Sequence, residues 1–285
     1  MFINLISKFS DTYKSMQKQE FLELLERSNS LGFNEYKLEK DFLLTLILIK
    51  FWEVFPDLIF KGWTCLNKIY FPYFRLSEDL DFIINFPGGR ASRKTLLKKY
   101  ELEIYEYLSR LWLKVAKIEK LDNYKIARYI YTYNSCIDES KQSVIFDISL
   151  KSKLQLPIHH WKILSIYQDK ILEEDIFGNH TIACIDLHEA LAEKIRAALT
   201  RSTPAIRDFF DIWYVREYSD FDFNTQDFRE LVNIKLAEVE YLYSIDESYK
   251  VLEKQIETDL IPVLHKEYDF SLSEIYDFVI TFKNK

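Results

Sequence analysis

The strongest constraint on the fold comes from residues 61–84, KGWTCLNKIYFPYFRLSEDLDFII, in a chain of 285 residues. Just upstream, residues 58–60 form a short apolar segment that leads into Gly62, which is typical of a buried strand ending at a turn. Residues 63–70 predict a short helix, and the apolar run at residues 80–86 predicts a second strand, stopped by Pro-Gly-Gly. The order strand, glycine, helix, strand predicts a mixed β-sheet with helices in this half of the chain.

Polar groups suited to phosphate and metal binding lie at both ends of this segment. The expected helix begins just after Gly62 and carries Thr64 in its first turn, and the backbone N–H groups of a helix N-terminus bind phosphate. In the second strand, Asp79 and Asp81 project from one face because side chains alternate along a strand. Two carboxylates this close repel each other unless a divalent cation or a basic group lies between them.

A third carboxylate, Asp147, lies in the strand-like sequence SVIFDISL at residues 143–150. Residues 127–134 alternate in the same way and predict the antiparallel partner of this strand. If the strand also lies beside the one that bears Asp79 and Asp81, three carboxylates meet at one edge of the sheet. Such a cluster is what two Mg²⁺ ions need for phosphoryl or nucleotidyl transfer, and one carboxylate can accept the proton of the attacking hydroxyl.

Each of these features alone has a simpler structural explanation. A glycine before a helix is usually an ordinary turn residue, an Asp-x-Asp pair is commonly exposed, and a single strand aspartate is more often a surface residue than a ligand. All three in this order are a much rarer coincidence, which favours a functional site.

The rest of the chain is mainly helical. Residues 11–51 predict two helices, with Gly32 ending the first and Asn34 or Asp41 capping the second. Residues 91–117 predict a long helix with a basic start. From residue 187 onward every expected element is a helix, over residues 187–201, 204–217, 225–243, 247–263 and 272–282. The predicted class is therefore α+β, with a mixed-sheet domain at residues 1–180 and a helical bundle at residues 181–285.

Composition excludes several classes of protein. Five glycines are too few for Gly-rich dinucleotide loops or β-propellers. Three scattered cysteines and five histidines show no zinc spacing and no disulfide framework, so we expect a cytoplasmic protein. No run is long enough to span a membrane, and the N-terminus lacks the apolar core of a signal peptide. The net charge of −7 disfavours a simple nucleic-acid coat, although the acidic excess lies after residue 150.

These motifs resemble the AbiEii/AbiGii-type toxin nucleotidyltransferases of the nucleotidyltransferase superfamily. The segment KGWTCLNKIY…RLSEDLDF is similar to the family pattern K-G-G-T-x-L…R-F-S-x-D-L-D-F. Residues 185–215, IDLHEALAEKIRAALTRSTPAIRDFFDIWYV, are similar to its second signature, E-x-L-x-E-K-L-x-A-L…R-x-x-x-R-D-x-Y-D-L. The resemblance covers residues 58–215, and it fails at one position, because Trp63 stands where the family has a second glycine.

The resemblance implies a nucleotidyltransferase that uses Mg²⁺, or Mn²⁺ in its place, to transfer a nucleoside monophosphate from an NTP to a hydroxyl. It also implies a toxin of the abortive-infection kind, with tRNA as the acceptor and a separately encoded antitoxin as a partner. The implied metal ligands are Asp79, Asp81 and Asp147, with Asp147 also the base. The implied nucleotide contacts are Lys61, Gly62, Thr64, Ser77 and Lys194. The implied catalytic residues are the three metal ligands together with Lys194 and Asp208.

Several alternatives stay open at this point. The acceptor can be a protein or a small molecule instead of tRNA, and Trp63 motivates a catalytically silent scaffold of the same fold. Lys194 can instead form a salt-bridge network with Asp208, Asp211 and Arg201. The basic residues near the start of the helix at residues 91–117 can guide an RNA backbone or form a solvated helix end; they are Arg90, Arg93, Lys94, Lys98 and Lys99.

Overall fold

The computed structural model describes residues 18–71, 73–150, 153–169, 171, 173–239 and 248–283. The chain divides into two compact units. The first unit is Met1–Lys153 with Ile158–Ile185, and the second is Leu154–Pro157 with Asp186–Lys285. The main division, after Ile185, lies five residues beyond the domain boundary predicted after residue 180.

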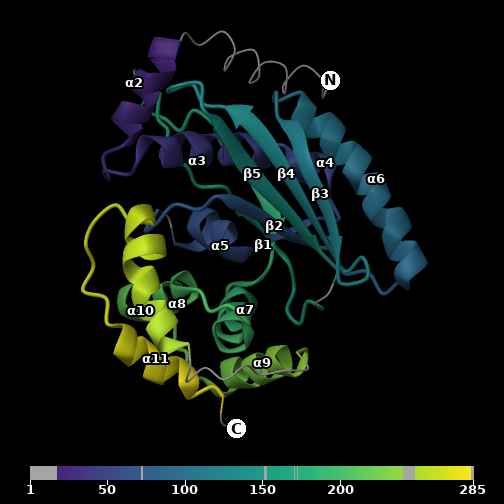
Figure 1. Ribbon diagram of the computed structural model, residues 1–285, viewed down its shortest axis with the longest axis vertical. Coiled ribbons are helices and arrows are strands. Elements are labelled where there is room, and N and C mark those ends of the chain that lie inside the picture. Colours follow the sequence, from purple (N-terminus) through teal and green to yellow (C-terminus); the bar gives the residue numbers. More distant parts are fainter. Residues whose placement is uncertain are drawn as a thin grey trace. The chain divides into compact units, whose positions relative to one another are not determined.

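In the described part of the first unit, seven strands form one mixed sheet in the order β3-β4-β5-β2-β1-β7-β6 (Figure 1). Its central strand β2 (Asp79–Ile83) runs antiparallel to β1 (Ile59–Lys61) and parallel to β5 (Lys141–Ser149). The outer strands are β3 (Lys114–Leu121), β4 (Ile126–Asn134), β6 (His159–Lys162) and β7 (Thr181–Cys184). The predicted mixed sheet and the antiparallel pairing of β4 with β5 are thus confirmed.

The long helix predicted over residues 91–117 is present, but its predicted end is wrong. Helix α6 (Arg90–Ser109) ends earlier, and Trp112, with φ of 59°, turns the chain into edge strand β3. Most of β3 is exposed, so it lacks the apolar alternation that marks a half-buried strand. The four-residue strands β6 and β7 were not expected either, because segments this short carry almost no periodicity.

Helices and aromatic side chains cover one face of the sheet. The helices are α2 (Lys18–Ser28), α3 (Glu35–Leu48), α4 (Phe51–Val54) and α6, which lies beside β3 and β4 in Figure 1. Phe82 of β2 stacks on Phe51 at 4.4 Å and on Phe146 of β5 at 4.8 Å between ring centroids. Asn34 caps α3 as one of the two predicted caps, whereas Asp41 lies inside that helix. Burying this face leaves the opposite face of β4, β5 and β2 for polar side chains.

The helix predicted over residues 63–70 is present in two parts. A short α-helix, α5 (Gly62–Cys65), continues directly as the π-helical turn η1 (Leu66–Tyr70). Single π-helical turns of this kind are rare and are often found at functional sites. The turn lies within the segment that the sequence marks for phosphate binding.

The described part of the second unit is helical, as predicted. Its elements are α7 (Leu187–Thr200), α8 (Ile206–Tyr218), α9 (Gln226–Ala237), α10 (Tyr249–Gln255), η3 (Ile256–Leu260), η4 (Ile261–Val263) and α11 (Leu272–Ile280). The expected break near Pro262 is the short 3₁₀ helix η4. The end of the helix predicted over residues 225–243 and the start of that over 247–263 lie outside the described residues, as do residues 11–17 of the first predicted helix. Across the residues with described structure, we find no helix both long and apolar enough to cross a membrane.

Candidate active site

The turn between β1 and α5 brings the backbone of Gly62 against the side chain of Asp81. Gly62 has φ of +74°, in the left-handed region that favours glycine. A Cβ atom at this position would lie 2.2 Å from Oδ2 of Asp81, so a larger residue cannot be accommodated without movement. Glycine is therefore required here for two independent reasons, the backbone conformation and the closeness of a carboxylate.

The strand register places charged side chains in one row across five strands. Asp81 of β2 pairs with Lys61 of β1 on one side and with Asp147 of β5 on the other. Asp147 in turn pairs with Arg128 of β4, which pairs with Glu119 of β3. Paired residues point to the same face of a sheet, so this row lies opposite the aromatic core. The adjacency of the Asp147 strand to the Asp-x-Asp strand is thereby confirmed.

Arg128 holds Asp147 through a two-pronged ion pair. Its Nε donates to Oδ1 at 3.0 Å and to Oδ2 at 3.2 Å, and its Nη2 donates to Oδ2 at 2.7 Å. The hydrogen bond to Asp147 is the main cause that raises the pKa of Arg128 above its ordinary value, and the charges of Asp79 and Glu119 act in the same direction. The guanidinium therefore lies within electrostatic reach of two carboxylates of the predicted metal site.

Asp79 and Asp81 fit a divalent metal as a pair of ligands, and the role of Asp147 as the third ligand stays a prediction. In the described ranges, no three His, Cys, Asp or Glu side chains gather closely enough to hold one ion. Mg²⁺ typically takes one or two carboxylates and completes its shell with substrate phosphates and water, which Asp79 and Asp81 can match. Both are half-buried on either side of the fully buried Leu80, and the carboxylate of Asp81 lies directly against the backbone of Gly62.

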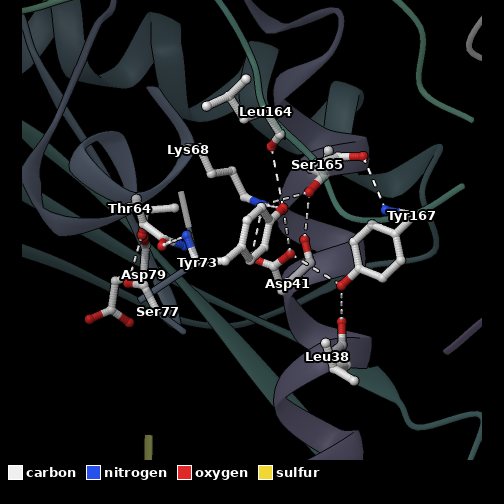
Figure 2. A network of polar contacts seen from close by, with 12 residues as sticks. Leu38, Asp41, Thr64, Lys68, Tyr73, Ser77, Asp79, Leu164, Ser165 and Tyr167 are labelled. Carbon is white, nitrogen blue, oxygen red and sulfur yellow. Dashed lines mark hydrogen bonds and ion pairs between the residues drawn. The ribbon is translucent and has the colours of Figure 1, made fainter. Parts of the chain in front are cut away.

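The hydroxyl groups of Thr64 and Ser77 are held inside the protein. The Thr64 hydroxyl is hydrogen-bonded to Ser77 Oγ at 2.7 Å and to the carbonyl oxygen of Asp79 (Figure 2). Both residues are buried, with 1% and 7% of their surface exposed. In this arrangement they tie the first turn of α5 to the beginning of β2, and so set the position of Asp79 relative to the turn at Gly62. Their predicted contact with nucleotide stays a prediction.

Trp63, at the position where the family has a second glycine, is packed into the protein. Only 6% of its surface is exposed, and the guanidinium of Arg75 lies 3.6 Å from the centre of its ring. Its ring also meets Phe74 edge to face at 4.4 Å. The indole therefore occupies the interior beneath the turn, where it neither projects from the surface nor offers a face for a nucleotide base.

A buried ion pair anchors the π-helical turn to α3. Nζ of Lys68 lies 2.8 Å from Oδ1 of Asp41, and both side chains are almost completely buried (Figure 2). Lys68 also donates to the Thr45 hydroxyl at 2.7 Å. Tyr73 and Tyr167 donate to Oδ2 of Asp41 at 3.3 and 3.1 Å. The Asp41 carboxylate thus accepts from three side chains of three different segments, which fixes η1 and therefore α5.

Burial governs the titration of this network. Desolvation lowers the pKa of Lys68 below its ordinary value, although the charge of Asp41 opposes it. Burial, with Asp41 as the next cause, raises the pKa of both Tyr73 and Tyr167 well above the ordinary value. The two phenols therefore stay protonated and continue to donate to Asp41 at neutral pH.

Glu78, which directly precedes β2, links that strand to α3. It accepts from Lys40 at 2.6 Å and from Lys37. Burial alone would raise the pKa of Glu78, but the hydrogen bonds from the two lysines outweigh it and bring the value to about 2. A carboxylate whose pKa is lowered on folding stabilises the protein above its unfolded pKa of roughly 4.5, and this contribution is lost as the pH falls toward 2.

We expect Glu78→Gln to lower the melting temperature by roughly 2–4 °C at pH 7, because the two lysines lose a charged partner. The difference from the wild type should shrink steadily between pH 5 and pH 2, since the wild-type carboxylate is itself protonated there. Differential scanning calorimetry across this range measures both quantities. Glu53→Gln, which removes the partner of Lys50 in a surface ion pair, serves as the control and should give no such convergence. A Glu78→Gln curve parallel to the wild type down to pH 2 would contradict the assignment.

In the second unit, Lys194 lies among acidic side chains. Its Nζ is 2.8 Å from Asp208 and 3.0 Å from Asp211, and Arg201 also pairs with Asp208 at 3.0 Å. The salt-bridge network that was open from the sequence is therefore formed. A triphosphate contact by Lys194 is compatible with this network only if an incoming phosphate competes with two carboxylates, so the catalytic roles of Lys194 and Asp208 stay predictions.

The glutamate that opens the second signature has a structural role. Glu189 accepts hydrogen bonds from the backbone N–H groups of Gln155 and Leu156 at 2.8–3.1 Å. Its carboxylate also lies 2.5 Å from Nζ of the fully buried Lys235. Glu189 thus binds the segment Leu154–Pro157 to the helical bundle, which explains why that segment belongs to the second unit.

The basic residues at the beginning of α6 do not form one uniform cluster. Arg93 is used internally, because it donates to the carbonyl oxygens of Gly88 at 2.9 Å and of Asn123. Lys99 pairs loosely with Glu103 at 3.8 Å. Arg90, Lys94 and Lys98 are exposed. An RNA contact by this helix stays a prediction. Of the five basic residues, Arg93 fits this role least well, because its guanidinium already binds backbone carbonyl groups.

Sequence reasoning missed Arg128, Lys68 and Asp41 as members of the site and its support. Arg128 could have been found, because it lies at the same parity as Asp147 in the two alternating strands. The sequence gives less information about Lys68 and Asp41. Each is a charged residue inside an apolar helical run, which indicates a buried ion pair but does not identify the partner.

A mixed sheet that sets an Asp-x-Asp strand between a glycine turn and a second aspartate strand defines the nucleotidyltransferase class of fold. The sequence model of a family described as nucleotidyl transferase AbiEii toxin, type IV toxin–antitoxin system, matches residues 51–281. The chain therefore belongs to the AbiEii nucleotidyl transferase toxin family. The resemblance seen in the sequence is confirmed, and nucleotidyl transfer is the activity of the class.

One solved structure shares this fold, and a second is reported beside it. The crystal structure of JHP933 from Helicobacter pylori has a TM-score of 0.50 and 16% sequence identity, over 88% of this chain and 91% of that chain. A second H. pylori crystal structure, of a candidate nucleotidyltransferase, has a TM-score of 0.46 and 16% identity, over 88% and 94% of the two chains. A comparison with curated protein sequences gives no match.

Proposed function

We propose that this protein is a Mg²⁺-dependent nucleotidyltransferase toxin that transfers a nucleoside monophosphate from an NTP to a hydroxyl of tRNA and releases pyrophosphate. The observation that carries the proposal is the strand register, which sets Asp79, Asp81 and Asp147 on one polar face beside the Gly62 turn. Family membership supports the reaction class and the toxin role. A cytoplasmic location and a separately encoded antitoxin are parts of the same proposal.

The chain's own residues divide the work of this reaction. When bound, Mg²⁺ neutralises the charge that develops on the transferred phosphate and on the leaving pyrophosphate. Asp79 and Asp81 hold the metal from the face of β2. Asp147, one strand away, is the third metal ligand and accepts the proton of the acceptor hydroxyl. The turn at Gly62, with Lys61 before it and Thr64 after it, receives the phosphates, and Lys194 supplies a further positive charge.

Transfer of label from NTPs radiolabelled at the α-phosphate tests this function. The purified protein is incubated in turn with each of the four NTPs and with tRNA, a protein mixture or small hydroxyl compounds. We expect label in tRNA from at least one NTP, abolished by EDTA and restored by Mg²⁺ or Mn²⁺. Label in a protein or a small molecule instead would replace the proposed acceptor. No transfer to any acceptor, under conditions where the protein is folded, would refute the proposal.

Asp79→Asn and Asp81→Asn should each lower the rate of nucleotidyl transfer by a factor on the order of 10³ or more. Each substitution removes a metal ligand together with its negative charge. Circular dichroism should show the fold unchanged. Glu119→Gln is the matched control, since it removes a carboxylate from the same register row three strands away from Asp81. It should retain the wild-type rate. Wild-type turnover in either aspartate variant would remove that residue from the site.

A further inference from the structure

The ion pair between Arg128 and Asp147 is not used in the reaction proposed above. Asp147, the proposed base, has both carboxylate oxygens engaged by the guanidinium of Arg128, at distances of 2.7–3.2 Å. Because the guanidinium already occupies both oxygens, this carboxylate has fewer lone pairs left to face a metal or an acceptor hydroxyl. The arrangement observed is therefore a resting one, and the reaction requires it to change.

The charges around this pair show why the resting arrangement forms. Asp81 and Asp147 are direct register partners on adjacent strands, which lie roughly 5 Å apart. With Asp79 on the same face, three like charges repel each other in the absence of a cation. Arg128 lies on the next strand in the same register and compensates this charge from within the chain.

The pair is also placed so that it can open. The side chain of Arg128 is 41% exposed, whereas that of Asp147 is 18% exposed, so the guanidinium reaches solvent while the carboxylate stays in the sheet. An arginine fork binds carboxylate and phosphate with the same geometry. A triphosphate bound near Asp79 and Asp81 can therefore replace the carboxylate of Asp147 as the acceptor for the Arg128 guanidinium.

We propose that Arg128 is an exchangeable counter-cation, which holds Asp147 while metal and nucleotide are absent and moves its guanidinium to the triphosphate when they bind. The inference rests on the proposed function and deepens it, because it names the residue that keeps the base inactive until substrate arrives. It also implies that metal binding and nucleotide binding are coupled. Without nucleotide, a metal ion must compete with Arg128 for Asp147. With a triphosphate present, Arg128 has another partner and this competition disappears.

The first measurement is Mn²⁺ binding to the full-length protein without nucleotide, followed by the electron paramagnetic resonance signal of unbound Mn²⁺. Arg128→Gln should bind Mn²⁺ about 10-fold more tightly than the wild type, within the usual range of such couplings. Arg128→Lys keeps the charge but loses the fork, so it should lie between the two. It also serves as the variant to use if Arg128→Gln does not fold.

Two controls separate the fork from general electrostatics. Lys117→Gln removes one positive charge on the same face, where Lys117 pairs with Glu119 at 2.6 Å, and should change Mn²⁺ affinity by no more than about twofold. Arg128→Gln combined with Asp147→Asn should bind Mn²⁺ no more tightly than Asp147→Asn alone, because Arg128 acts through Asp147. An equal gain in Lys117→Gln, or a gain that persists without Asp147, would overturn the inference.

The second measurement is NTP affinity in EDTA, determined by fluorescence anisotropy of a labelled NTP. Arg128→Gln should bind at least about fivefold more weakly than the wild type, since one charge-assisted contact is lost. Unchanged affinity would show that Arg128 does not move to the triphosphate. A wild-type protein that binds neither Mn²⁺ nor NTP would refute the proposed function itself. A wild type that binds both, with Arg128→Gln indistinguishable from it, would refute only the role of Arg128.

Discussion

Asp41→Asn should destabilise the first unit by about 3–5 kcal/mol, because it leaves the ammonium of Lys68 buried without its charged partner. Lys68 has none of its side chain exposed, and Asp41 has only 1%. The effect should appear as a lower free energy of opening for the amides of α3 and of the segment from Gly62 to Tyr70. Hydrogen exchange resolved by peptide measures it and reports on this unit separately from the helical one.

Asp41→Leu together with Lys68→Met is the informative control for this substitution. Replacing both members of a buried ion pair by apolar residues is often neutral or stabilising. Neither phenol of the network is orphaned, because Tyr73 keeps the carbonyl oxygen of Leu164 as an acceptor and Tyr167 keeps that of Leu38. The double variant should therefore recover most of the stability that Asp41→Asn loses. Equal destabilisation in both variants would mean that local packing, and not the charge left unpaired, is responsible.

Gly62→Ala should lower nucleotidyl transfer by at least about 10²-fold, because the new methyl group must displace the carboxylate of Asp81, and a misplacement of 1 Å can cost this much. A further cost of roughly 1–2 kcal/mol in stability comes from holding alanine in the left-handed conformation. Transfer of α-labelled phosphate and a thermal melt measure the two effects on the same preparation.

Gly178→Ala separates the two causes. Gly178 also has a positive φ, of +69°, but no atom lies within 4 Å of the position of an added Cβ. It should show the cost of the backbone conformation and no loss of transfer. If Gly62→Ala loses no more activity than Gly178→Ala, the closeness of Gly62 to Asp81 has no part in the reaction.

Much of the polar face that carries Asp79, Asp81 and Asp147 was predictable, because each of its strands carries a local signal. The apolar residues of β2 and β5 alternate with their aspartates, so the period of two alone places Asp79 and Asp81 on one face and Asp147 on a polar face. Gly62 marks the end of β1 for an equally local reason, its backbone conformation. Where a residue's role depends only on its neighbours in sequence, the sequence was sufficient.

The interactions that were missed all depend on pairing between distant segments. The contact of Arg128 with Asp147 requires the register of β4 against β5, and a slip of one residue would send Arg128 to the other face. Lys68 and Asp41 meet only once two helices have packed. The first four residues of β3, 114–117, were assigned to a helix because an exposed edge strand buries no regular face. Periodicity carries no information about which segment becomes a neighbour.

The parallel neighbours β2 and β5 have a consequence for the order in which this protein is made. Asp81 and Asp147 are register partners, yet they are 66 positions apart in the chain, with α6, β3 and β4 between them. At about 5–20 residues per second, the third carboxylate is synthesised roughly 3–13 s after the first two. A growing chain that ends before β5 has the Asp79–Asp81 pair but no base, and β7, which completes the other side of β1, follows later still. If the proposed function holds, nucleotidyl transfer therefore begins only when translation of the sheet is nearly finished.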